Sequence, residues 1–245
     1  MSRKVAPTKG GFTMKRLMQC SLLAVSLIAA AAPALGKVVP GEEVGLTVCL
    51  MNDAGVPAAL EEELERRVDA LMEDAAIRIR WLNGRDPGRT AETRCVCSHP
   101  EPMRVLILHL MATGKVALPS ELGQAFLGED GLGVTADLFL DRVERLTGER
   151  ELDLRRLLAH VAAHELGHLL LGVNAHTVAG LMQARMDGES LARVEQGRLR
   201  FSVAQMKKMH DRVNAAGQLV SPIHTAASCG ENGLTRSPLN QTDAM

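Results

Sequence analysis

Hydrophobic residues recur along the chain at two spacings, one typical of strands and one typical of helices. Alternating or continuous apolar runs bounded by turn-forming residues predict strands, and such runs lie at Val44–Met51, Ile77–Leu82, Met103–Leu110 and Val134–Phe139. Apolar residues three and four positions apart predict amphipathic helices, and they occur at residues 57–75, from Asp153 to Leu171 and from about Phe201 onward.

The segments between these runs are rich in glycine and proline. Residues 83–102 and 111–133 are expected to be loops. Gly172 is placed to end the helix that precedes it, and Ser202 with Gln205 can form a capping box for the last helix. The predicted fold class is therefore α/β, with a small mixed twisted sheet and helices packed on it.

Composition limits what this fold can be built from. The apolar fraction of 46% is enough for a buried core, but only 2% of the residues are aromatic and none is tyrosine. We therefore expect a core of leucine, valine, methionine and alanine. The sequence shows no internal repeat, and we predict one domain over residues 37–220 followed by a polar tail over residues 221–245.

The first 36 residues resemble an export signal in composition. They hold five basic residues and no acidic one, an apolar run from Ser21 to Ala32, and small residues suited to cleavage after Ala34 or Gly36. Translation could begin at Met1 or at Met14. A membrane anchor is the alternative, but the run is shorter than the ~20 residues that a bilayer needs. We expect a cleaved signal, no stable membrane insertion, and an exported, periplasmic or extracellular protein.

Charge and cysteine content refine this picture. Without residues 1–36 the chain has 23 basic against 29 acidic residues and no basic cluster, which argues against nucleic-acid binding. Four cysteines then remain, an even number that favours disulfides in an exported protein. A cysteine metal site is disfavoured because no CxxC spacing is present. Cys95 and Cys97 are two residues apart, so a bond between them would be strained, and Cys49 and Cys229 are their expected partners in an order that is left open.

The strongest chemical signal is the HELGH sequence at residues 164–168. Residues four apart share one face of a helix, so His164 and His168 can present two imidazoles to one metal ion. Glu165 lies beside them and can reach a water molecule on that ion. This pattern predicts a site for one Zn²⁺ ion, with Glu165 as the catalytic general base.

A catalytic zinc site needs a third protein ligand. His176 is the expected one, because Gly172 ends the helix and lets the chain turn back toward the metal. Glu189 or another carboxylate is the alternative, and Asn174 is a poorer zinc ligand. His160 lies one helical turn before the motif and is expected to pack near the site rather than bind the ion.

Together with Met182 in the sequence Gly180-Leu181-Met182, this stretch resembles the metzincin clan of zinc peptidases. Members of that clan have a zinc helix, a glycine turn, a third histidine and a methionine-containing turn beneath the metal. The resemblance spans about residues 44–215, with its specific part between His164 and Met182. It implies a metzincin-like fold, with Met182 as the floor of the metal site.

The spacing departs from the clan's pattern after His168. The pattern has glycine three residues later and the third ligand after three more, and those positions hold Leu171 and Asn174 here. Glycine comes instead at position 172 and histidine at position 176. We therefore expect a divergent branch of the clan or a different loop around the metal.

Two functions fit these residues. In a zinc-dependent endopeptidase, Glu165 would take a proton from the activated water and pass it to the leaving amine. An extended peptide would pair with an exposed edge strand, for which Val134–Phe139 is the candidate. The alternative is an exported, non-catalytic binding domain that zinc stabilises. The intact Glu165 favours the enzyme. We expect it to be a monomer and to act on peptides or proteins.

Overall fold

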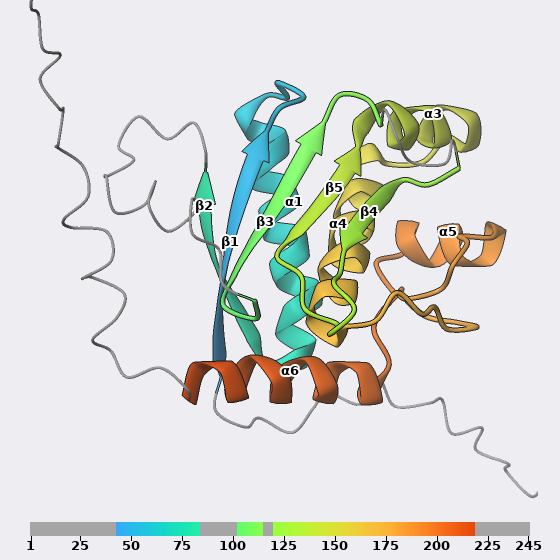
Figure 1. The fold of residues 1–245 in the computed structure, drawn as a ribbon. Helices are drawn as coiled ribbons and strands as arrows, with labels where there is room; N and C mark the ends of the chain where they lie inside the picture. The colour runs from blue at the N-terminus through green and yellow to red at the C-terminus, as the bar shows by residue number, and fades with distance from the viewer. Residues whose placement is uncertain (1–42, 84–101, 115–119, 219–245) are drawn as a thin grey trace, which may run out of the picture. The chain divides into compact units, whose positions relative to one another are not determined.

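The computed structural model describes residues 43–83, 102–114 and 120–218. Within them, five strands form one mixed sheet in the order β2-β1-β3-β5-β4 (Figure 1). This arrangement confirms the predicted α/β class. The strands are β1 (Val44–Asn52), β2 (Ile77–Asn83), β3 (Val105–Met111), β4 (Gly123–Phe126) and β5 (Thr135–Phe139).

The order of the strands decides which backbone is free for a partner. β1 runs parallel to β2 and β3, and β3 runs parallel to β5, whereas β4 pairs with β5 in the antiparallel direction. β5 is therefore an interior strand, and the prediction that Val134–Phe139 forms the exposed edge is wrong. The edge strand on this side of the sheet is β4, a four-residue strand within the segment 111–133, where the sequence predicts a loop.

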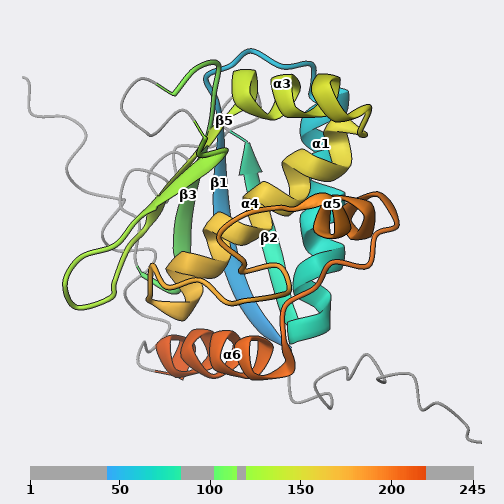
Figure 2. The same ribbon diagram turned by 90° about the vertical axis from the view of Figure 1, so that its right-hand side faces the viewer.

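Helices cover one face of this sheet. Figures 1 and 2 show α1 and α4 lying side by side across that face, with α6 crossing one end. The predicted helix over residues 57–75 is an α-helix followed by one 3₁₀ turn. The helices are α1 (Ala58–Met72), η1 (Glu73–Ala75), α3 (Leu140–Arg150), α4 (Leu154–Leu171), α5 (Gly188–Glu195) and α6 (Val203–Gln218).

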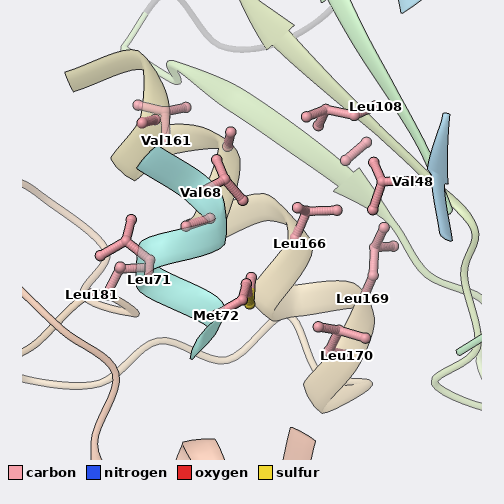
Figure 3. Close-up of a cluster of buried hydrophobic side chains, with 14 of the residues drawn as sticks. Val48, Val68, Leu71, Met72, Leu108, Val161, Leu166, Leu169, Leu170 and Leu181 are labelled. Carbon is pink, nitrogen blue, oxygen red and sulfur yellow. The ribbon is translucent and has the colours of Figure 1, made fainter. Parts of the chain in front are cut away.

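The core lies between the sheet and its two covering helices. One hydrophobic cluster includes Val48 of β1, Leu108 of β3, Val68 of α1 and Leu166 of α4, and all four are fully buried (Figure 3). Fully burying side chains of this size contributes about 1.5–3 kcal/mol each. As predicted, leucine, valine, methionine and alanine make up most of this cluster.

The capping box predicted for the last helix is present. The Ser202 backbone N–H donates to the Gln205 side-chain oxygen at 2.8 Å, and the Gln205 N–H donates to the Ser202 hydroxyl at 3.3 Å. α3 was not predicted, because its sequence is mostly charged and buries only a narrow stripe that includes Leu140 and Val143.

Several predictions concern residues outside the described ones. These are the export signal, the polar tail and three of the four cysteines, so the disulfide pairing of the buried Cys49 also stays a prediction. None of the helices in the described ranges is long and apolar enough to cross a membrane.

Candidate metal centre

The candidate metal centre is built on α4, a helix that is buried along most of its length. The Asp153 side chain caps its N-terminus by accepting from the Arg155 N–H at 2.8 Å, and Gly172 ends it with a φ of 67°. Every residue from Leu157 to Leu171 is buried. The polar motif therefore lies on a buried apolar helix.

Two backbone carbonyls fix the orientation of the helical histidines. His164 Nδ1 lies 2.7 Å from the Leu181 carbonyl oxygen, and His168 Nδ1 lies 2.8 Å from the Val173 carbonyl oxygen. Each Nδ1 therefore carries the proton, which leaves a lone pair on Nε2. The two Nε2 atoms are 3.0 Å apart, close to the ~3.3 Å expected for two imidazoles on one tetrahedral zinc ion.

His176 completes a group of three imidazoles. It lies on the loop after Gly172, with its ring centroid 5.3 Å from that of His164 and 4.9 Å from that of His168. One ligand atom from each of the three residues lies within 4.8 Å of the others, so the group could hold a metal ion. The structure thus brings together all three residues that the sequence proposed as ligands.

Burial keeps the two helical imidazoles, His164 and His168, neutral. Burial lowers the pKa of His164 to about 4 although the hydrogen bond to the Leu181 carbonyl raises it, and the neighbouring His168 and His176 lower it by smaller amounts. Burial likewise lowers the pKa of His168. Neutral imidazoles with free Nε2 lone pairs are the donors that zinc takes, so the residues present fit a zinc ion.

The side chain of Glu165 lies between α4, which we call the metal helix, and the edge strand β4. It is only 6% exposed, and burial, reinforced by the nearby Glu121, raises the pKa of its carboxyl to about 8 despite a hydrogen bond from the Ala125 N–H. Gly123 of β4 packs directly on it: a Cβ atom there would lie 2.8 Å from Glu165 Cγ and 2.9 Å from Oε1. β4 therefore fixes where this carboxylate can lie.

The three imidazoles and Glu165 line one open cleft of about 770 Å³. Its walls come from β4, from the segment just before it, and from the loop between α4 and α5. Leu146 of α3 and Val161 of α4 add apolar side chains to the lining of the cleft. The other lining residues include Glu121, Leu122, Ala125, Leu146, Val161, Asn174, Gln183, Arg185 and Met186.

Met182 packs beneath the metal helix. It is fully buried, and a Cβ atom at Gly167 would lie 2.6 Å from its sulfur. Gly167 stands between the two motif histidines, so its lack of a side chain lets the sulfur approach the helix there. The preceding residue, Leu181, supplies the carbonyl that orients His164.

Two other residues weighed from the sequence lie elsewhere. Glu189 is on α5, where its exposed carboxylate pairs with Arg193 at 2.5 Å. His160 is buried, and its Nδ1 lies 2.7 Å from the Arg156 carbonyl oxygen within α4. Neither lines the cleft. The importance of Gly123 and Ala125 was not predicted from the sequence, because β4 itself was not.

Comparisons with known proteins give distant structural similarities only. No family model and no curated protein matches this sequence. A zinc-dependent peptidase from Methanocorpusculum labreanum is similar with a TM-score of 0.44 and 16% identity, over 66% of this chain and 99% of that one. Archaemetzincin from Methanopyrus kandleri is similar with a TM-score of 0.44 and 21% identity, over 72% and 99%. Both TM-scores are below 0.5.

Proposed function

We propose that this protein is a zinc-dependent endopeptidase. The observation that carries the proposal is the convergence of three imidazoles, His164, His168 and His176, with one buried carboxylate, Glu165, in a cleft beside an edge strand. Three protein ligands leave a fourth tetrahedral position for water or substrate, which is the pattern of catalytic rather than structural zinc sites.

Glu165 and the two backbone carbonyls would have different roles in the reaction. When bound, zinc would acidify a water molecule and polarise the scissile carbonyl. The Glu165 carboxylate is placed to take the proton of that water and to hand it to the leaving amine. The carbonyls of Leu181 and Val173 hold the two helical imidazoles in the tautomer that presents Nε2.

The cleft suits an extended polypeptide. β4 is an edge strand and lines the cleft beside the histidines. An incoming peptide can therefore add a strand to the sheet edge, which would place a main-chain carbonyl near the imidazoles. The apolar walls formed by Leu122, Leu146, Val161 and Met186 favour substrates with apolar side chains next to the cleaved bond.

Hydrolysis of fluorescein-labelled casein by the protein without residues 1–36 tests the proposal. We expect cleavage that stops on chelation and returns with Zn²⁺, and a loss of at least about 10²-fold in kcat for Glu165→Gln with zinc affinity retained. Glu189→Gln, an exposed carboxylate outside the cleft, is the matched control and should keep full activity. A fully active Glu165→Gln variant would refute the mechanism.

A second candidate is an exported, non-catalytic domain that zinc stabilises. Asn174 favours it, because this residue lines the cleft beside His176 and could close the site as a fourth protein ligand. In that case zinc would raise the melting temperature, casein would stay intact, and Asn174→Ala would weaken zinc binding as strongly as His176→Ala does.

We also propose that the protein is exported, and this proposal rests only on the composition of residues 1–36. Sequencing the N-terminus of the protein recovered outside the cytoplasm tests it, and we expect a start at Leu35 or Lys37. The intact N-terminus on recovered protein would refute signal cleavage.

A further inference from the structure

Arg212 joins three segments that are far apart in the sequence. It lies on α6, its Nη1 donates to the Leu170 carbonyl at 3.1 Å, and its Nη2 donates to the Gly131 carbonyl at 3.4 Å. Leu170 belongs to the last turn of the metal helix, whose carbonyls have no partner within the helix. Gly131 belongs to the turn between β4 and β5.

Two glycines allow this contact. At Gly172, which ends α4, a Cβ atom would lie 2.0 Å from Arg212 Nη1 and 2.7 Å from Cζ, so the guanidinium packs directly against this residue. At Gly131 a Cβ atom would lie 2.6 Å from the Gly172 carbonyl oxygen. Both glycines have positive φ, 67° and 71°, a conformation that other residues rarely adopt.

The contact lies where the chain leaves the metal helix. Val173, the next residue, supplies the carbonyl that orients His168, and His176 follows three residues later. A guanidinium is a fixed planar donor that can bind two carbonyls at once, and its charge complements the negative end of a helix. The direction in which residues 173–176 leave α4 is therefore set at Arg212.

We infer that Arg212 is a positioning residue for the third metal ligand. It lies outside the cleft and acts by holding the helix end and the β4–β5 turn together, so that the following loop brings His176 to the other two imidazoles. This role rests on the proposed zinc site and adds to it a residue from a different helix.

Zinc affinity and the Co²⁺ absorption spectrum of the full chain test this role. Arg212→Met keeps the length of the side chain but removes its donors, and we expect zinc affinity to fall by about tenfold, as when support for a ligand is lost. Arg212→Lys can bind only one carbonyl at a time and should recover part of the affinity. Lys208→Met, one turn earlier on α6 and exposed, should leave affinity unchanged.

A double-mutant cycle separates positioning from general loss of stability. In the His176→Ala background, Arg212→Met should cause no further loss of zinc affinity, because its effect passes through His176. The Co²⁺ spectrum of Arg212→Met should also approach that of His176→Ala. If the two substitutions are additive, or if Arg212→Met binds Zn²⁺ as tightly as the parent, the positioning role is refuted. A parent chain that binds no Zn²⁺ would refute the proposed function instead.

Discussion

Gly123→Ala is the substitution that isolates the edge strand's effect on the general base. An added Cβ would lie 2.8 Å from Glu165 Cγ, 2.9 Å from Glu165 Oε1 and 2.9 Å from the Asp137 carbonyl oxygen. Carbon atoms in proteins pack at about 3.5–4.0 Å, so these contacts require a movement of nearly 1 Å. The Asp137 carbonyl is backbone of the paired strand β5 and yields least, so Glu165 must move.

The size of the effect follows from that displacement. Misplacing a catalytic group by about 1 Å can cost about 10²-fold in rate, which corresponds to about 2.7 kcal/mol in the activation barrier. The three atoms nearest to the new methyl group belong to Glu165 and Asp137 and not to the imidazoles, so we expect zinc affinity to stay unchanged. We therefore expect kcat for casein hydrolysis to fall by about 10²-fold while the zinc dissociation constant stays at the parent value.

Gly45 provides a matched control in another strand. A Cβ atom at Gly45 in β1 meets nothing within 4 Å, so Gly45→Ala should keep full activity and gain up to about 0.5–1 kcal/mol in unfolding free energy. The assay is kcat and KM on labelled casein, zinc titration and urea unfolding for both variants. Should Gly123→Ala cleave casein at the parent rate, β4 would not control Glu165, and the reasoning from this contact would be wrong.

Three further substitutions test the fold that supports the site. Gly167→Ala should lower the unfolding free energy by about 1–3 kcal/mol in urea titrations, because the new methyl meets the Met182 sulfur at 2.6 Å; a gain of about 1 kcal/mol, as at an open helix position, would contradict this packing. Burial, together with neighbouring acidic groups, raises the pKa of Glu65 from its ordinary 4.5 to about 7, so the folded state binds the extra proton and stability falls as pH rises through that window. Glu65→Gln should remove this fall and stabilise the protein at pH 8 by about 1 kcal/mol, allowing for solvent screening at a half-buried site; an unchanged pH profile of urea unfolding would contradict it. Ser202→Ala removes the cap of α6 and should cost about 1 kcal/mol in the same titration, and no loss would mean that the Gln205 contact alone caps the helix.

The elements with strong hydrophobic periodicity could be predicted from the sequence, and the weakly apolar ones could not. α4 has leucines on every side, and β1 and β3 are nearly continuous apolar runs. Their apolar sequence is therefore enough to predict them as buried elements. β4 is four residues long and holds glycine, glutamine and alanine, and its stability comes from pairing with β5. No pattern in the local sequence indicates that β4 pairs with β5. The edge strand, and with it the contact between Gly123 and Glu165, therefore becomes visible only in the folded chain.

The proposed third ligand, His176, shows why residue spacing alone could not identify the whole site. α4 continues through Leu171, so the glycine that ends it comes one residue later than in the metzincin pattern, and His176 comes two residues later than the pattern's histidine. The structure nevertheless brings His176 within reach of both helical imidazoles. The position of His176 depends on the path of the loop after Gly172, and we infer that Arg212 fixes the start of that path. Arg212 binds the carbonyl of Leu170, 42 residues before it, and the carbonyl of Gly131, 81 residues before it. A count of residues between ligands measures the length of such a loop but contains no information about contacts from distant elements. For a proposed metal-binding histidine on a loop such as this one, the useful sequence signal is a glycine able to end the helix, with a histidine soon after it, rather than a fixed interval between the two.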